Sequence, residues 1–339
     1  MFKPIFYIII FIILSIEDGL ASDSVIRFLD SKSEDYAAMS KTIWSLAELG
    51  YQEKETSKLM QSHLKQENFS IDYGVAEIPT AFIASYGSGK PIIAILAEMD
   101  ALPGLSQDAK PERKIIKEEM PGHACGHHLF GTGSIAAAVA VKNWLIETGA
   151  TGTIRLYGTP AEEGGSGKVY MVRAGLFDDV DIVMHWHPSD RNDASPASSL
   201  ANKSAKFRFY GIAAHAAAAP EKGRSALDAV ESMNFMVNLM REHLPEPARI
   251  HYIITEGGAA PNIVPEYAEV YYYARHPDVD ELEKIWARII KVAEAAAVGT
   301  ETTLEYEVMH ANRPLLTNLP LAKLIFEKLS QVGGVYYNK

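Results

Sequence analysis

Residues 91–103 read PIIAILAEMDALP, a nearly continuous apolar run that turns acidic at its carboxyl end. A run without polar alternation is typical of a strand that is buried on both faces of an α/β sheet. Apolar residues at helical spacing over 33–68 precede it, and a helix of small residues over 134–145 follows. This alternation of strands and helices predicts an α/β domain with a mostly parallel sheet. Further strands are predicted at residues 80–86, 153–159 and 181–187.

The pattern changes after residue 190. Residues 191–204 are rich in Asn, Ser, Ala and Pro, and they predict a linker. The elements that follow have the order β-α-β-β-α-β, which is the ferredoxin-like arrangement of a small independent domain. We therefore expect the α/β domain over 22–203, an inserted domain over 204–311, and a return to an incomplete α/β domain over 312–339. The inserted elements are predicted at residues 205–210, 226–244, 249–255, 267–275, 279–297 and 302–309, and a last helix at 319–332.

The composition narrows the classes of function. Of the 339 residues, 47% are hydrophobic, which is enough for a buried core and excludes a disordered chain. The formal net charge is −11 and the sequence has no basic stripe, which argues against nucleic acid as a partner. The single cysteine, Cys125, excludes an intrachain disulfide.

The amino terminus has the pattern of a secretory leader. Lys3 precedes an apolar run over residues 5–14, and Gly19-Leu20-Ala21 offers small residues for a cleavage site. This pattern predicts a signal peptide over residues 1–21 and an exported protein, periplasmic or secreted. The alternatives are an uncleaved anchor or a buried helix, although the run is shorter than the roughly 20 residues that span a bilayer. No later segment is expected to cross a membrane, so no membrane association is predicted after cleavage.

Side chains of metal-ligand type gather where the predicted strands end. In an open α/β sheet, ligand sites form beyond the carboxyl ends of the strands, so these groups are expected to converge. A thiolate, imidazoles and carboxylates are the usual donors for zinc and related divalent ions. Each group alone has an ordinary explanation, such as a core cysteine or a solvated acidic edge. Four groups together favour a metal site, and they contain Asp100, His123, Cys125, His127, His128, Glu162, Glu163, His185 and His187.

Glu162 and Glu163 are adjacent, and this adjacency has a chemical use. Neighbouring residues of an extended segment point in opposite directions, so one carboxylate can bind metal while the other faces water. A bound metal lowers the pKa of water from 15.7 towards about 7, and a nearby carboxylate can take the proton. The pair therefore predicts hydrolysis of an amide or peptide bond.

Six motifs resemble those of one known family: AEMDALPG, GHACGHHLFGTG, TPAEEGG, DIVMHWHP, AAHAAAAP and GGAAPNIVPEYAEVYYYAR. The family comprises co-catalytic metallopeptidases and amidohydrolases, among them aminoacylases, hippurate hydrolase, indole-acetyl-amino-acid hydrolases and carboxypeptidase G. The chain looks most like its p-aminobenzoyl-glutamate hydrolases, and the resemblance covers about residues 35–312. It implies an enzyme that cleaves the amide bond of an N-acyl amino acid, p-aminobenzoyl-glutamate or a related one. It also implies two divalent metal ions, Zn or Mn, as cofactors.

The resemblance assigns roles at the metal centre as well. Glu162 looks like the general base that takes the proton from metal-activated water. Asp100 matches the aspartate that orients a ligand histidine in many relatives. Here the residue two before it is Glu98, so Asp100 is expected to act behind a ligand rather than on the metal. The implied metal ligands are Cys125, His127, Glu163 and His187.

The inserted domain corresponds to the family's lid and dimerisation domain. His215 matches the histidine that reaches the active site of the partner subunit and stabilises the developing oxyanion. Asn262 and Arg275, with Arg313 in support, match residues that hold the free carboxylate of the substrate, and the planar fork of arginine suits this task. The resemblance thus implies a homodimer formed through the lid, acting on a small acyl-amino-acid substrate. It leaves open whether a second, different subunit is required.

One departure from the family concerns the carboxyl-terminal part. The family's catalytic domain resumes after the lid and carries a final ligand histidine in a glycine-rich segment, whereas this sequence has one more predicted helix. The later candidate, His310, falls in the last predicted strand of the lid and does not match. We therefore expect a truncated chain that lacks one ligand. The alternative function is a non-catalytic pseudoenzyme or a dimerisation subunit of the same fold.

Overall fold

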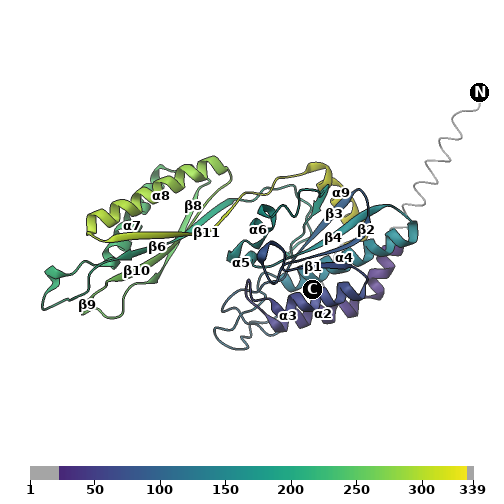
Figure 1. Ribbon diagram of the computed structural model, residues 1–339, viewed down its shortest axis with the longest axis horizontal. Coiled ribbons are helices and arrows are strands. Elements are labelled where there is room, and N and C mark those ends of the chain that lie inside the picture. The colour runs from purple at the N-terminus through teal and green to yellow at the C-terminus, as the bar shows by residue number, and fades with distance from the viewer. Residues whose placement is uncertain (1–22, 334–339) are drawn as a thin grey trace, which may run out of the picture. The chain divides into compact units, whose positions relative to one another are not determined.

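The computed structural model describes residues 23–333, so the predicted signal peptide lies outside the described residues. The chain forms two units, one made of residues 193–328 and one made of the rest (Figure 1). Residues 23–192 form an α/β unit, and residues 193–328 form an antiparallel sheet with helices on it. Each unit has its own hydrophobic core.

The α/β unit is built on a five-stranded sheet with the spatial order β1 (Ser70–Tyr73), β2 (Phe82–Ser88), β4 (Gly152–Thr159), β3 (Ile92–Glu98) and β5 (Ile182–Met184). The strands β4, β3 and β5 are parallel, as the sequence predicts. The pairs β1–β2 and β2–β4 are antiparallel, so the expected mostly parallel sheet is corrected to a mixed one. A short turn containing η1 (Val75–Glu77) joins β1 to β2, whereas a parallel pair needs a crossover of a dozen or more residues.

Helices cover both faces of this sheet: α2 (Ser33–Leu46), α3 (Lys54–Gln66) and α4 (His127–Thr148) on one, and α6 (Gly167–Arg173) on the other. Alternate residues of β3 supply the two cores, because successive side chains of a strand point to opposite faces. Ile95 and Ala97 pack with α2, α3 and α4, while Ala94 and Leu96 pack with Met171 of α6. The strand is therefore buried on both faces, as its apolar run predicts.

The helix α4 begins at His127, earlier than the predicted 134–145, directly after Gly126 with a φ of 90°. By length and composition this helix would pass as a membrane span, contrary to the expectation for segments after the leader, but 56% of its apolar window is buried in the fold. It packs closely on the sheet: a Cβ on Gly131 would lie 2.8 Å from the carbonyl oxygen of Glu98. The first turn of α4 is thus held against the carboxyl end of β3.

The unit of residues 193–328 holds an antiparallel sheet with the order β11 (Thr303–Asn312), β6 (Ala201–Tyr210), β10 (Tyr267–His276) and β8 (Arg249–Glu256). Two helices, α7 (Ala226–Met240) and α8 (Val279–Thr300), pack on this sheet and close the core. The β-α-β-β-α-β order and the strand order confirm the predicted ferredoxin-like domain. The strand β6 starts inside the predicted linker, because Ala201 is buried in the same core as Ala205.

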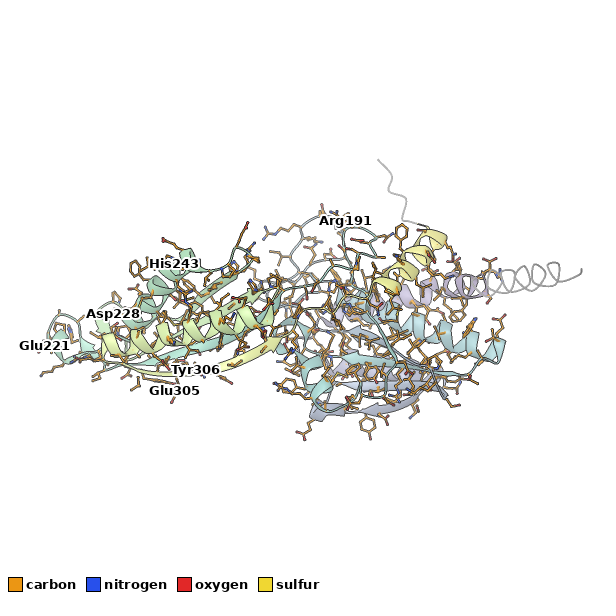
Figure 2. The ribbon with its side chains drawn as sticks, turned by 90° about the horizontal axis from the view of Figure 1, so that it is seen from above. Arg191, Glu221, Asp228, His243, Glu305 and Tyr306 are labelled. Atoms are coloured by element: carbon orange, nitrogen blue, oxygen red, sulfur yellow. The ribbon has the colours of Figure 1, made fainter. Side chains whose placement is uncertain are left out.

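Short-range interactions fix the elements of this second unit. The Ser225 hydroxyl accepts a hydrogen bond from the backbone N–H of Asp228 at the start of α7, which is a typical N-cap. Asp228 is labelled in Figure 2. On the sheet, the ring of Tyr306 in β11 stacks on Phe207 of β6, with 5.7 Å between ring centroids. A ribbon of β7 (Ala214–His215) and β9 (Ile263–Val264) extends the unit, and the predicted last helix is α9 (Leu319–Val332).

Candidate metal centre

The carboxyl ends of β3 and β4 lie side by side, and the candidate donors follow them. Glu98 at the end of β3 pairs in register with Thr159 at the end of β4. Asp100 comes two residues after Glu98, and Glu162 comes three residues after Thr159. The start of α4 adds His127 to the same edge. The sheet therefore brings these predicted donors together at one edge, as expected from the sequence.

One group of donors combines a thiol with two imidazoles. The ligand atoms of Cys125, His127 and His187 all lie within 4.8 Å of one another. The Cys125 Sγ is 3.4 Å from Nε2 of His187, whose Nδ1–H donates to the carbonyl of Pro188 at 2.8 Å. Hydrogen bonds with His127 and then His187 lower the pKa of the Cys125 thiol, which favours the thiolate that binds metal.

His127 is fully buried and presents its Nε2 to this centre. Its Nδ1 lies 3.0 Å from the Asp100 carbonyl oxygen and 3.1 Å from Asp100 Oδ1. Both partners are acceptors, so Nδ1 carries the hydrogen and the lone pair is on Nε2. Burial opposes a charged imidazole, yet the neighbouring Asp100, Cys125 and Glu98 outweigh it and raise the pKa of His127 to about 12. The surroundings therefore favour a cation on the lone pair of Nε2, whether a proton or a metal ion.

Asp100 also fixes the turn that carries the paired glutamates. Its Oδ2 accepts a hydrogen bond of 2.8 Å from the backbone N–H of Glu163. This turn, α5 (Glu162–Gly165), is irregular, since Gly164 has a φ of 98° and Ala161 before it a φ of 54°. Glu163 lies beside Cys125, and its Oε1 is buried. One aspartate thus orients both His127 and the segment that bears Glu163.

Sequence reasoning names Glu98 only as the residue two before Asp100 and gives it no role at the site. Its Oε2 lies 3.0 Å from Nε2 of His127 and 3.9 Å from Nε2 of His187. Burial alone would raise the pKa of Glu98, but contacts with His127, His185 and Lys168 hold this pKa well below the usual range. A signal was available, because residues two apart on a strand share a face and Asp100 had already been placed at the site.

Glu162 lies at the open side of the centre. With Glu98 and His127 it forms a second group of donors whose ligand atoms are within 4.8 Å of one another. Its Oε2 is 4.0 Å from Nε2 of His127, and its side chain is 42% exposed. Burial and the charge of Glu98 raise the pKa of Glu162 above that of an ordinary carboxyl. A partly exposed carboxylate of raised pKa suits proton transfer with water.

The donor set fits a divalent cation. Within residues 23–333, three buried donor atoms of the centre lack a hydrogen-bond partner: Glu98 Oε2, His127 Nε2 and Glu163 Oε1. Buried polar atoms are normally satisfied, and a bound cation would satisfy these three together. Sulfur and imidazole on one side suit zinc, and carboxylate oxygens on the other also suit manganese.

Glu53 supports the same turn from behind and gives a pH-dependent prediction. It is fully buried, and its carboxylate accepts hydrogen bonds from the Ala161 N–H (2.8 Å) and the Thr80 hydroxyl (3.0 Å). Burial, partly offset by these bonds, raises the pKa of Glu53 to about 7 from 4.5. The folded state therefore binds more protons than the unfolded state between these values, so Glu53 lowers stability as the pH rises through this window.

We expect Glu53→Gln to flatten this dependence. Between pH 4.5 and 7 the wild type should lose on the order of 3 kcal/mol more stability than the variant. Urea unfolding of both proteins at several pH values measures the difference. Parallel stability curves would show that Glu53 does not titrate in this window.

The remaining predicted site residues lie in the unit of residues 193–328. His215 in β7 and Asn262 next to β9 are exposed and near each other, since the Ala216 N–H donates to the Asn262 carbonyl at 3.0 Å. Arg275 lies on β10 with its guanidinium 5.2 Å from the ring centroid of Tyr273. Arg313 lies just after β11. Within this unit the structure brings together His215 and Asn262.

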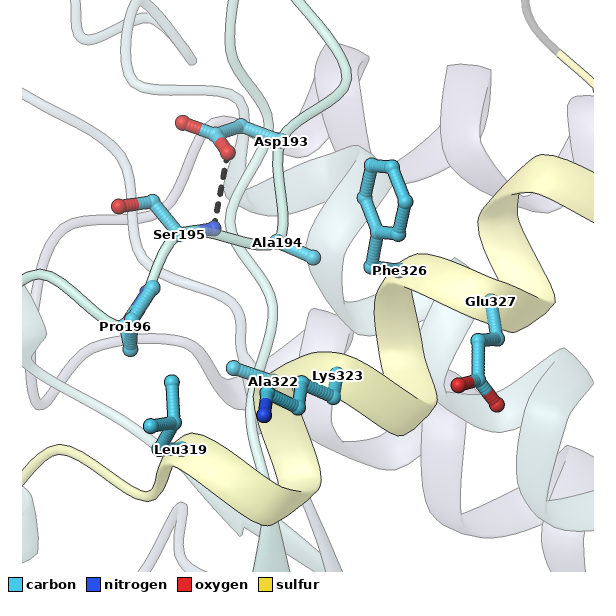
Figure 3. Close-up of a pocket in the computed structure, with 9 residues that line it drawn as sticks. All are labelled: Asp193, Ala194, Ser195, Pro196, Leu319, Ala322, Lys323, Phe326 and Glu327. Atoms are coloured by element: carbon cyan, nitrogen blue, oxygen red, sulfur yellow. Dashed lines mark hydrogen bonds between the residues drawn. The ribbon is translucent and has the colours of Figure 1, made fainter.

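A pocket of about 300 Å³ lies elsewhere, between residues 193–196 and the first turns of α9 (Figure 3). Its wall is shaped by a turn in which Asp193 accepts a hydrogen bond from the backbone N–H of Ser195 at 2.8 Å. The other side consists of Leu319, Ala322 and Phe326 with two charged residues. None of the candidate site residues lines this pocket.

Comparisons with known proteins agree with this architecture. The family profile described as a peptidase dimerisation domain matches residues 201–301. An aminobenzoyl-glutamate utilization protein from Klebsiella pneumoniae superposes with a TM-score of 0.70 at 21% identity, covering 92% of this chain and 84% of the other. A dinuclear metal-binding peptidase of the M20 family from Bacillus subtilis gives 0.62 at 20% identity, covering 90% and 81%. Both likenesses concern the fold.

Two curated proteins have a higher sequence identity to this chain than the two solved structures just named. One of the subunits of p-aminobenzoyl-glutamate hydrolase from Escherichia coli is 44% identical over 93% of this chain and 66% of its own length. The human Xaa-Arg dipeptidase is 31% identical over 90% of this chain and 70% of its own length. The chain spans about two thirds of the length of these curated relatives. The chain belongs to the M20 peptidase family.

Proposed function

We propose that this protein is a metal-dependent amidohydrolase that cleaves the amide bond of an N-acyl amino acid. The observation that carries the proposal is that two groups of potential donors share His127, and that the second group contains the partly exposed Glu162. The 44% identity to a p-aminobenzoyl-glutamate hydrolase supports p-aminobenzoyl-glutamate or a related compound as substrate.

The side chains divide the chemistry between them. Cys125, His127, Glu163 and His187 would hold two divalent ions, Zn or Mn, which when bound polarise the scissile carbonyl and acidify water. Glu162 would take a proton from water at its carboxylate and deliver it to the leaving amine. Asp100 keeps the hydrogen on Nδ1 of His127, so that the lone pair on Nε2 stays directed at the centre.

We propose that the second unit contributes a dimer interface and substrate contacts. The match to a peptidase dimerisation domain supports a homodimer. In that dimer His215, exposed on its ribbon, would stabilise the oxyanion in the other protomer. Asn262, Arg275 and Arg313 would hold the free carboxylate of the substrate. Two different subunits of the Escherichia coli hydrolase are similar to this chain, which supports a test for a second, different subunit as well.

Metal removal tests the proposal. The purified protein, loaded with Zn²⁺ or Mn²⁺, should hydrolyse p-aminobenzoyl-glutamate or another member of a panel of N-acyl amino acids. Dialysis against a chelator should abolish this hydrolysis, and re-addition of the metal should restore it, because the pKa of free water is too high for attack at neutral pH. A folded, metal-loaded protein that hydrolyses no member of the panel would favour a non-catalytic role.

A further inference from the structure

Glu98 occupies the middle of the metal centre, although the ligand set implied by the family does not include it. It is the last residue of β3, and it is 2% exposed. We propose that Glu98 is itself a metal ligand through Oε2, and that Lys168 is the positioning residue that holds its other oxygen. This inference rests on the metal dependence in the proposed function.

The first argument is the contact between Glu98 and His127. Because Nδ1 of His127 donates to Asp100, its Nε2 offers a lone pair, and the carboxylate Oε2 offers lone pairs only. The two atoms lie 3.0 Å apart, and neither has a hydrogen-bond partner among the described residues. Two buried acceptors at this distance repel unless a cation is shared between them, either a proton on Nε2 or a metal ion that takes its place. A divalent ion would satisfy both atoms.

The second argument is the environment of the other carboxylate oxygen. Glu98 Oε1 accepts a hydrogen bond of 2.5 Å from the Lys168 ammonium and lies 3.5 Å from Nε2 of His185. Lys168 belongs to α6 and is 27% exposed, so its charge offsets the cost of burying the carboxylate. With Oε1 engaged, the carboxylate cannot rotate freely, and Oε2 is held towards His127.

The third argument concerns the chemical character of the two donor groups. Cys125 with His127 and His187 forms a sulfur and nitrogen group, which suits zinc. The second group, Glu98 with His127 and Glu162, contains two carboxylates, of which Glu98 is the proposed ligand, and a carboxylate oxygen suits manganese better. Glu98 is the buried member of this second group, whereas Glu162 is partly exposed and free to exchange protons with water. Glu98 thus gives the centre its oxygen-rich side.

Titration calorimetry with Mn²⁺ and Zn²⁺ tests this assignment and requires no turnover, so its outcome is separable from that of the activity test. Glu98→Gln should lower the Mn²⁺ affinity by about tenfold or more, and the Zn²⁺ affinity by less. Cys125→Ser should show the reverse preference. Unchanged Mn²⁺ affinity in Glu98→Gln, or equal losses for both metals, would overturn the assignment.

Lys168 is tested with a matched control. Lys168→Met should weaken Mn²⁺ binding, because the carboxylate of Glu98 is then no longer held. Lys142→Met, which removes a similar ion pair with Glu67 in the same unit, should leave the affinity unchanged. Equal effects of the two substitutions would mean that Lys168 acts only through stability. If Glu98→Gln does not fold, Glu98→Asp keeps the charge but shortens the reach, and wild-type Mn²⁺ affinity in it would contradict the proposal.

Discussion

Replacing Glu162 with Gln is expected to abolish measurable amide hydrolysis while the bound metal stays at the wild-type level. The carboxylate lies 4.0 Å from Nε2 of His127 at the exposed side of the centre, where it can reach water. An amide of the same size cannot take a proton, so the loss should be about 10²–10⁴-fold in kcat. Steady-state kinetics with metal analysis of the same preparation measures both quantities.

The neighbouring residue provides the matched control. Glu163→Gln changes the adjacent carboxylate, whose buried Oε1 lies at the inner side of the turn. We expect this variant to lose metal and activity together, whereas Glu162→Gln loses activity alone. If Glu162→Gln also lost metal, Glu162 would be a ligand rather than the base, and the division of work between the pair would be wrong.

Phe130→Ala is expected to cost about 3–5 kcal/mol of stability and to weaken metal binding as well. Phe130 is fully buried in the first turn of α4. Its ring makes edge contacts with His127, with centroids 6.4 Å apart, and with His187 at 5.9 Å. Removing the ring leaves a cavity directly behind two of the donor histidines. Urea unfolding gives the stability change, and calorimetry gives the metal affinity.

The control for Phe130 is Phe207, an equally buried ring in the core of residues 193–328. Phe207→Ala should lower the stability of its own unit by a similar amount, but it should not change the affinity for metal. Where Phe130→Ala is too unstable to purify, Phe130→Leu fills more of the cavity and serves for the metal measurement. Wild-type metal affinity in a folded Phe130 variant would show that the ring does not position the histidines.

Much of the fold could be predicted because the spacing of apolar residues within each segment is typical of a strand or of a helix. The apolar run of β3 indicates burial on both faces, and the structure places a core on each side. The inserted β-α-β-β-α-β unit was predicted from its order of elements and is confirmed, together with the last helix, Leu319–Val332. The antiparallel pairing of β2 with β4 was missed, because single-sequence patterning does not report which strands become neighbours.

The candidate site, like the fold, could be predicted only in part. Metal-ligand residue types after strand ends identify Cys125, His127 and His187, which the fold brings within reach of one ion. The sequence assigns Glu98 no role because it ends an apolar strand, and its place at the site depends on two long-range contacts with His127 and Lys168. These contacts join Glu98 to residues 29 and 70 positions later in the sequence, and no local sequence pattern indicates them.

X-ray absorption spectroscopy of the zinc-loaded protein tests most directly whether these residues hold the metal. The account predicts one sulfur neighbour at about 2.3 Å, from Cys125, together with nitrogen and oxygen neighbours at about 2.0–2.2 Å. In Cys125→Ser the sulfur shell should disappear. A spectrum without a sulfur shell, unchanged by Cys125→Ser, would contradict the proposed metal centre.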